Sequence, residues 1–381
     1  MNKKLISLLL SAALAVSMLT VPAFAAEGGE ADAALDETNE VVVTLGDTVT
    51  ASTVEDTDKA AADKTAADKT AADKTAADKT ETADSAPAAS TEKKQITYVA
   101  LGDSIVAGVG LADVKYAKDS TTLYSVDMSP NFKGYSSDCY VGKVATMMGL
   151  DRDHAINLGL PALTAPDLAD MVRDGQMPKM NMESGCWYKY PEFQDYIRKA
   201  DVVSVQIGSN DAFVPCIVAL GNATNWKSEA LAASVLAGDL RASGSPAAAL
   251  IQGIKDMHLT RDERNATWNL LTSEMGKICD RIYPQTTAGL ISVVQEIRKL
   301  NPDCQILLMG YTDPVPFVPC WHNYFKKLNK FEKQLAETYD LTYVAIPKAK
   351  TDLDVHPTIS GHEYIAKKIV NSIELAEDSA Q

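Results

Sequence analysis

The sequence has 381 residues, with 36 lysines and arginines against 51 aspartates and glutamates. The formal net charge of −15 excludes a basic chain built for sequence-independent nucleic-acid binding, and it argues against a surface that seeks anionic lipid. We therefore expect no nucleic-acid partner. Since 46% of the residues are apolar, the chain can bury a sizeable core, which excludes wholesale disorder.

Residues 1–25 have the layout of a secretory signal peptide. Lys3 and Lys4 precede an apolar run from Leu5 to Val21, and Ala23-Phe24-Ala25 supplies small residues for cleavage. The alternative is an uncleaved anchor helix, but three serines and a proline interrupt the run. No other stretch approaches the ~18 consecutive apolar residues that a membrane span needs. The sequence therefore predicts secretion after cleavage near Ala25, with no stable membrane span.

Residues 26–92 form a low-complexity segment. The pentad Ala-Ala-Asp-Lys-Thr occurs four times without interruption within residues 61–80. Such a sequence has almost nothing apolar to bury, so it predicts a flexible, solvated spacer. The alternative is a repeat that binds the cell wall or another partner. Residues 27–92 hold 17 acidic and five basic side chains, so most of the charge belongs to the spacer, and residues 93–381 carry only −5.

The folded part begins near residue 93 and alternates strands with helices. The predicted strands are 96–101, 154–158, 201–207, 305–309 and 341–345. The predicted helices are 140–149, 167–173, 289–300, 322–338 and 361–375, with several helical stretches between residues 228 and 283. This order predicts a parallel sheet of about five strands covered by helices on both faces, a three-layer α/β/α fold.

Polar clusters follow two of the predicted strands. Gly102-Asp103-Ser104 ends the first, and Gly208-Ser209-Asn210-Asp211 ends the third. Ligands of parallel sheets bind beyond the carboxyl ends of strands, so these are candidate sites. A serine at a strand-to-helix turn can act as a nucleophile, and an asparagine amide can face the oxygen that becomes negative during ester cleavage. The alternative is that both are ordinary turns.

A serine nucleophile needs a base, and the chain has five histidines. His356 is the best candidate, because Pro357 cannot extend a preceding helix and so places His356 on the loop that enters the last helix. We expect structural positions for the others: His154 in a strand, His258 and His362 on helices, and His322 at a helix start.

These motifs, in this order, resemble those of the GDSL-type serine esterases and lipases, also called SGNH hydrolases, and in particular a secreted branch of that family. The resemblance covers residues 96–376. It implies an α/β/α fold and a carboxylic-ester hydrolase that works through an acyl-enzyme without a cofactor. By residue, it implies that Ser104 is the nucleophile and His356 the base, with Asn210 and the Ser104 backbone N–H in the oxyanion hole. The ester substrate would be an acyl lipid or an acetylated glycan, which leaves a carbohydrate or cell-wall O-deacetylase as the alternative.

The chain departs from the family's pattern at two places. Where the family has a glycine whose N–H joins the oxyanion hole, this chain has Ala162, and alanine does not readily adopt a positive φ. Gly159 is the donor under a different alignment. Where the family has an aspartate three residues before the histidine, this chain has Leu353. Asp354, Asp352 or the Leu353 carbonyl would then orient the imidazole. These departures keep open a second reading, an inert surface-binding module of the same fold.

Two further expectations concern carboxylates near these motifs. Asp354, His356 and His362 are close in sequence, so a metal site is an alternative, but no matching ligand pair is apparent elsewhere and we predict none. We expect Asp103 and Asp211 to brace their own turns.

Six cysteines and a long connection remain. An even cysteine count in a secreted chain predicts up to three disulfides, and we expect sequence neighbours to pair among Cys139, Cys186, Cys216, Cys279, Cys304 and Cys320. Buried free thiols are the alternative. Residues 212–288 form a helical insertion with apolar faces that either complete the core or cover the acyl pocket as a lid.

Overall fold

The computed structural model describes residues 95–114, 132–231, 243–314, 318–351 and 356–374. The predicted signal peptide and the predicted spacer lie outside the described residues. Within the described part of the chain, no helix is long and apolar enough to cross a membrane.

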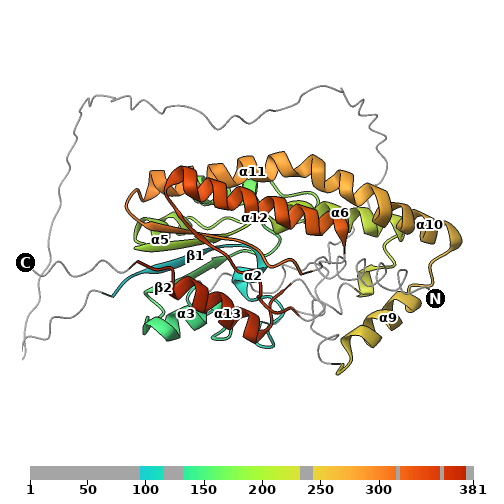
Figure 1. The fold of residues 1–381 in the computed structure, drawn as a ribbon, viewed down its shortest axis with the longest axis horizontal. Helices are drawn as coiled ribbons and strands as arrows, with labels where there is room; N and C mark the ends of the chain where they lie inside the picture. Colours follow the sequence, from blue (N-terminus) through green and yellow to red (C-terminus); the bar gives the residue numbers. More distant parts are fainter. Residues whose placement is uncertain (1–94, 115–131, 232–242, 315–317, 352–355, 375–381) are drawn as a thin grey trace, which may run out of the picture. The chain divides into compact units, whose positions relative to one another are not determined.

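Five parallel strands form a single sheet in the order β2-β1-β3-β4-β5. Figure 1 shows this sheet between helices. The strands are β1 Tyr98–Gly102, β2 Ala155–Gly159, β3 Val202–Gln206, β4 Gln305–Met309 and β5 Thr342–Val344. The central strands β1 and β3 are buried along their whole length, which explains their nearly continuous apolar sequence. The register sets Gly102 opposite both Gly159 and Gln206, so the carboxyl ends of three neighbouring strands lie side by side.

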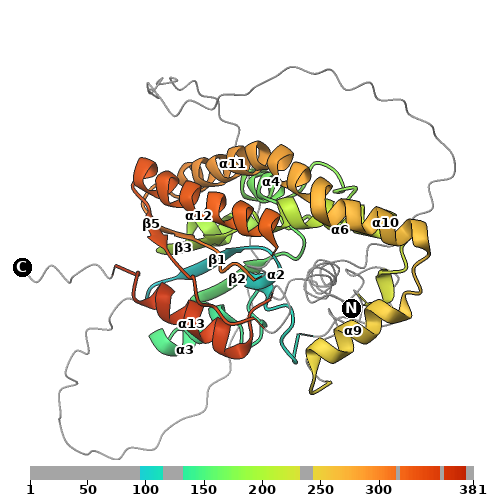
Figure 2. The same cartoon turned by 45° about the vertical axis from the view of Figure 1, so that its right-hand side comes forward.

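Helices cover both faces of the sheet. They are α2 Ser104–Ala107, α3 Tyr140–Met148, α4 Ala165–Asp174, α5 Phe193–Arg198, α6 Ser209–Ala223, α9 Pro246–Asp256, α10 Arg261–Asn269, the π-helix η1 Leu270–Glu274, α11 Met275–Leu300, α12 Pro319–Tyr339 and α13 Ile359–Val370. Helices α3 and α13 lie together on one face, and α11 and α12 lie on the other, with α4 beside α11 (Figure 2). The predicted three-layer α/β/α fold with about five parallel strands is confirmed.

The largest boundary error concerns α11. The predicted helix 289–300 is only the last part of a helix that starts at Met275 and contains Pro284. Gly289 therefore lies inside this helix and is not its first residue. A Cβ at Gly289 would lie 2.7 Å from the backbone nitrogen of Pro166, so this glycine allows α11 to pack closely against the start of α4. Tertiary packing therefore explains a glycine that the sequence pattern treats as a helix boundary.

The predicted insertion contains α9, α10, η1 and the first half of α11. Leu231 is buried, and a Cβ at Gly253 of α9 would meet its Cδ1 atom at 2.4 Å. The apolar contact between Leu231 and α9 therefore completes a core, which is one of the two roles predicted for the insertion. Residues 232–242 of the insertion lie outside the described residues.

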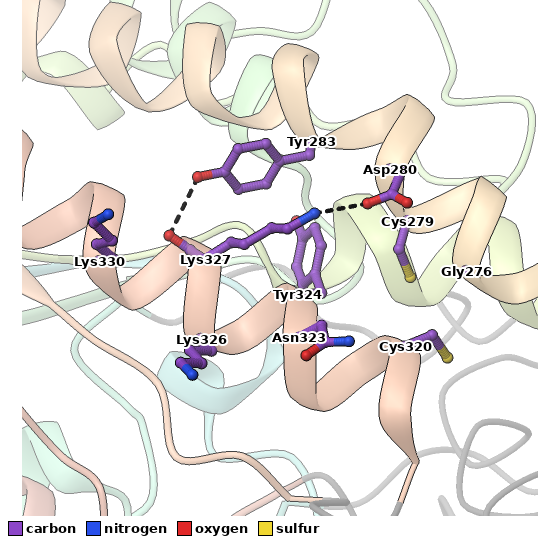
Figure 3. Close-up of a pocket in the computed structure, with 10 residues that line it drawn as sticks. All are labelled: Gly276, Cys279, Asp280, Tyr283, Cys320, Asn323, Tyr324, Lys326, Lys327 and Lys330. Atoms are coloured by element: carbon purple, nitrogen blue, oxygen red, sulfur yellow. Dashed lines mark hydrogen bonds and ion pairs between the residues drawn. The ribbon is translucent and has the colours of Figure 1, made fainter.

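All six cysteines are free thiols in the structure. Cys304 lies directly before β4. Cys320 lies beyond the other end of that strand, because His322, two residues after it, bonds through its side chain to Asp313, which follows β4. A five-residue strand spans roughly 17 Å, and disulfide-bonded Cα atoms lie within about 7 Å, so the predicted Cys304–Cys320 pairing is wrong. The thiols of Cys139 and Cys186 contact different partners, Asn157 and Ser184. Cys279 of α11 lies near Cys320 of α12 (Figure 3).

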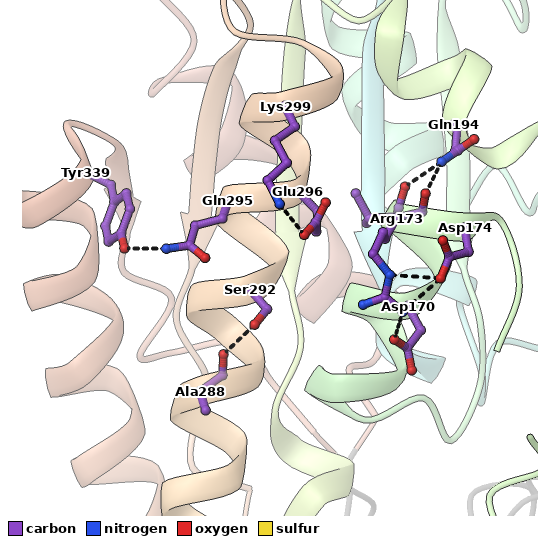
Figure 4. Close-up of polar contacts among 11 residues, drawn as sticks. Asp170, Arg173, Asp174, Gln194, Ala288, Ser292, Gln295, Glu296, Lys299 and Tyr339 are labelled. Carbon is purple, nitrogen blue, oxygen red and sulfur yellow. Dashed lines mark hydrogen bonds and ion pairs between the residues drawn. The ribbon is translucent and has the colours of Figure 1, made fainter. Parts of the chain in front are cut away.

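The outer faces of α4, α11 and α12 carry polar side chains that bond along and between helices (Figure 4). Arg173 at the end of α4 forms ion pairs with Asp170 and Asp174. Gln295 of α11 donates to the Tyr339 hydroxyl of α12 over 3.1 Å. These exposed polar faces are the solvent side of the helical layer. Ligands of parallel sheets bind beyond the carboxyl ends of the strands, so the functional site is expected there.

Candidate functional site

Ser104 and His356 lie together, although 252 positions separate them in sequence: the distance between Ser104 Oγ and His356 Nε2 is 3.0 Å. Both residues are buried, with 8% and 2% of their surfaces exposed. This is the spacing expected of a hydroxyl that passes its proton to an imidazole.

The end of β1 fixes the position of Ser104. Gly102 has a φ of 155°, and a Cβ there would lie only 2.1 Å from the Gln206 carbonyl oxygen. Asp103 is the N-cap of α2, and its side chain accepts the Ile105 N–H over 3.0 Å. Ser104 is therefore the first residue of a capped turn directly at the edge of the sheet.

The start of α13 holds the segment that contains His356 in place. Thr358 caps α13 by accepting the Gly361 N–H, and its own N–H donates to the Lys350 carbonyl over 2.8 Å. His362 lies on α13 as predicted, and its Nδ1 accepts the Tyr140 N–H at the start of α3 over 3.2 Å. His362 thus joins the two helices on one face of the sheet.

The Asp103 carboxylate joins three strand ends. Besides the Ile105 N–H, it accepts the Ser209 hydroxyl over 2.8 Å and the Tyr311 hydroxyl over 3.3 Å. Burial raises the pKa of Asp103, and these hydrogen bonds and the nearby His356 oppose the rise. The prediction that Asp103 braces its own turn is confirmed, but it also connects β1 to the segments after β3 and β4. Tyr311 was missed, although a polar aromatic residue directly after the fourth strand is a usable signal.

The predicted oxyanion donors lie on the neighbouring loops. The Asn210 amide donates to the Leu163 carbonyl over 3.0 Å, and an amide nitrogen has a second N–H. The Gly159 N–H donates to Asn157 Oδ1 over 2.9 Å, so it is already used. Among the described residues, no acceptor is found for the Ala162 N–H. Ala162 is therefore the better placed of the two alternatives.

Ala162 has a φ of 60°, so the expectation that alanine avoids this conformation is wrong here. A left-handed alanine costs about 1–2 kcal/mol, which the surrounding contacts must offset. Tyr188 supplies one of them, because its buried hydroxyl donates to the carbonyl of Pro161, the preceding residue, over 2.8 Å. Strained residues of this kind gather at functional sites.

Asp211 acts differently from the prediction. Its Oδ2 accepts the Ala165 N–H over 2.9 Å, so it braces the start of α4 and not only its own turn. Burial raises the pKa of Asp211 to about 7, and its hydrogen bonds oppose this rise.

We predict that Asp211 makes the folded state less stable as the pH rises. Its folded pKa of about 7 lies above the usual 3.8, so the folded state holds the proton more tightly and loses this advantage between about pH 4 and pH 7. Asp211→Asn keeps an acceptor for the Ala165 N–H and removes the titration. The free energy of unfolding of the variant, relative to wild type, should therefore rise by about 1–4 kcal/mol from pH 4 to pH 8 in denaturant titrations. A difference that stays constant over this range would contradict the assignment.

The remaining predicted residues are placed as follows. His322 bonds to Asp313 near the surface, at the start of α12 as predicted. His154 bonds to Asp151 in the turn directly before β2, so its predicted place within the strand is wrong. His258 is not on a helix but directly after α9, with a φ of 45°. Asp352, Leu353 and Asp354 lie outside the described residues, so the acid remains a prediction with three alternatives. Among the residues that the structure describes, no three metal-binding side chains form a cluster.

Residues 100–364 match the GDSL-like Lipase/Acylhydrolase family. Similar solved structures include the lipase Lip_vut3 from a goat rumen metagenome, at 14% identity over 73% of this chain and 97% of that chain, with a TM-score of 0.40. An extracellular lipase from Streptomyces rimosus is 14% identical over 73% of this chain and 100% of that chain, with a TM-score of 0.41. A mutant of Axe2, an acetyl-xylooligosaccharide esterase from Geobacillus, is 16% identical over 75% and 97%, with a TM-score of 0.38. No curated protein sequence matches the chain.

The family match covers the segment from β1 to α13, which contains the strand ends and the histidine loop described above. Membership of this family supports a hydrolase that acts on esters. The chain belongs to the GDSL-like lipase/acylhydrolase family.

Proposed function

We propose that this protein is a secreted carboxylic-ester hydrolase that acts through an acyl-enzyme on Ser104, with His356 as the base. The observation that carries the proposal is the distance of 3.0 Å between Ser104 Oγ and His356 Nε2 in a buried site. A serine hydroxyl becomes an effective nucleophile only when an adjacent base takes its proton, and this geometry supplies the base.

The reaction has two halves. Ser104 Oγ attacks the ester carbonyl while His356 Nε2 takes the serine proton, and the imidazolium then gives that proton to the departing alcohol. In the second half, His356 removes a proton from water, the resulting hydroxide attacks the acyl-serine, and the carboxylic acid is released as Ser104 regains its proton. No cofactor enters either half.

The oxyanion hole in this proposal consists of the Asn210 amide and the backbone N–H groups of Ala162 and Ser104. Its support is that these groups follow β3, β2 and β1, three adjacent strands whose carboxyl ends lie side by side. Asp354, Asp352 or the Leu353 carbonyl orients the imidazole and stabilises its charged form.

Two substrate classes remain within this proposal. The ester belongs to an acyl lipid, or it is an acetyl group on a glycan, in which case the protein is a carbohydrate or cell-wall O-deacetylase. The spacer at residues 26–92 would keep the exported enzyme near the cell wall. The inert binding module remains the alternative from another functional class.

A fluorophosphonate probe and a series of nitrophenyl esters from acetyl to palmitoyl test the proposal. The probe should label wild-type protein at Ser104, as mapped by peptide mass spectrometry, because only an activated serine reacts. The ester series then separates a deacetylase, active only on short chains, from a lipase. A wild-type protein that takes no label and cleaves no ester would be a binding module instead.

A further inference from the structure

Three thiols from three helices meet at the side of the molecule where α6, α11 and α12 pack together. The thiols of Cys216 on α6 and Cys320 on α12 both shift the pKa of the Cys279 thiol on α11, so the three side chains are near one another. Cys216 and Cys279 are buried, and Cys320 is partly exposed. A sulfur can form only one disulfide at a time, so Cys279 is a shared partner for two competing bonds.

The surroundings of the cluster favour one of the two bonds. Cys279 and Cys320 both line a pocket of about 350 Å³ between α11 and α12, together with Tyr283, Tyr324 and Lys327 (Figure 3). Cys216 does not line this pocket and is completely buried. A disulfide oxidant in solution therefore reaches the partly exposed Cys320 first.

The backbone also allows the two helices to be joined at this point. Gly276 lies one turn before Cys279, and the nearest atom to a Cβ built on it is the Cβ of Cys320, at 4.0 Å. A Cβ there would make an ordinary van der Waals contact with Cys320, so the start of α12 lies close to this turn of α11. Disulfide formation needs such a close approach of the two backbones.

We propose that Cys279 and Cys320 form a disulfide that joins α11 to α12, and that Cys216 is an internal thiol that exchanges with it. The oxidant is a small disulfide or a protein disulfide of an oxidising compartment, which the proposed secretion supplies. The Cys320 thiolate attacks the oxidant and releases one thiol. The Cys279 thiolate then attacks Cys320 Sγ in the mixed disulfide and releases the second thiol, so that two electrons and two protons leave the cysteines.

The exchange moves the bond without further oxidation. The Cys216 thiolate attacks Cys279 Sγ and displaces Cys320 as a thiol, so that the link passes from α11 and α12 to α6 and α11. Both outer helices reach the candidate site: α6 carries Asn210, and Tyr324 of α12 donates to the Gly208 carbonyl over 2.6 Å. The position of the bond therefore decides which of these helices is fixed to α11.

Peptide mapping of the exported chain, after equilibration with oxidised glutathione in vitro, tests the proposal directly. Thiols are blocked with N-ethylmaleimide in denaturant, and the digest is analysed without reduction. We expect a cross-linked peptide pair that contains Cys279 and Cys320, with Cys216 alkylated. Closing a loop of about 40 residues should raise the Tm of the oxidised protein above the reduced protein by roughly 5–10 °C.

Three serine variants separate the competing bonds, and Cys304→Ser is the matched control. Cys216→Ser should keep the Cys279–Cys320 bond and its Tm increase, Cys320→Ser should shift the bond to Cys216 and Cys279, and Cys279→Ser should abolish both. The proposal is wrong if full oxidation leaves Cys279 alkylated, or if wild type contains the Cys216–Cys279 bond alone. Because the oxidant is added and the bond is mapped chemically, failure here would not bear on ester hydrolysis or on secretion.

Discussion

Replacing either Ser104 or His356 by alanine is expected to lower kcat/KM for a nitrophenyl ester by about 10⁴-fold or more, and replacing both should cost hardly more than replacing one. The reason is that the two side chains act as one unit. Without the imidazole, the hydroxyl keeps its proton and is a poor nucleophile, and without the hydroxyl the imidazole has no proton to take. The 3.0 Å contact between Ser104 Oγ and His356 Nε2 is the structural basis of this coupling.

Single and double variants should be measured with matched controls. Ser209→Ala removes a buried hydroxyl that also bonds to Asp103 but has no proposed part in the reaction. His322→Ala removes a surface imidazole that bonds to Asp313. We expect His322→Ala to stay within about twofold of wild type and Ser209→Ala within about tenfold. Losses that multiply in the Ser104/His356 double variant would mean that the residues act independently, which contradicts the proposed mechanism.

The sheet was predictable because its strands are short apolar runs separated by helical patterns. β4 begins and ends where the sequence pattern places it, and the others differ by one or two residues at an end. The full length of α11 was not predictable from periodicity. Pro284 and Gly289 are ordinary boundary signals, and only the contact of α11 with Pro166 of α4 shows why a glycine is needed inside this helix.

The position of Ser104 followed from a motif at a strand end, and that of His356 from Pro357 at the entry to the last helix. The contacts that hold them required the order of the strands. Nothing local in the sequence shows that Tyr311, after β4, reaches the Asp103 carboxylate after β1. The same is true of Asp211 and the Ala165 N–H. Local rules also gave the wrong answer for Ala162, because tertiary contacts hold it in a conformation that alanine alone avoids.

The pairing of the cysteines is another feature that the sequence alone does not determine. An even count predicts disulfides, but it contains no information on pairing. Pairing by sequence order fails for Cys304 and Cys320 because β4 separates them, whereas Cys279 meets one cysteine from before it and one from after it in the sequence.

Asn210→Ala is expected to lower kcat by about 10²–10³-fold with little change in KM, the loss typical of one oxyanion donor. The substrate carbonyl is neutral in the bound state and becomes negative only as Ser104 attacks, so the lost N–H mainly affects the transition state. The complication is that the same amide donates to the Leu163 carbonyl, and its removal also loosens the loop that carries Ala162.

Tyr188→Phe is the control that separates these two effects. It removes the hydrogen bond to the Pro161 carbonyl in the same loop, but it removes no group proposed to face the substrate. If the Asn210 amide acts on the oxyanion, Tyr188→Phe should lower the Tm by a few degrees and leave kcat within about threefold of wild type. If both variants lose kcat equally, the conformation of the loop that carries Ala162 governs the rate. The only effect that the two substitutions share is the loss of a hydrogen bond to that loop. A selective loss of kcat in Asn210→Ala, at a Tm similar to that of Tyr188→Phe, can come only from the N–H that faces the reacting ester.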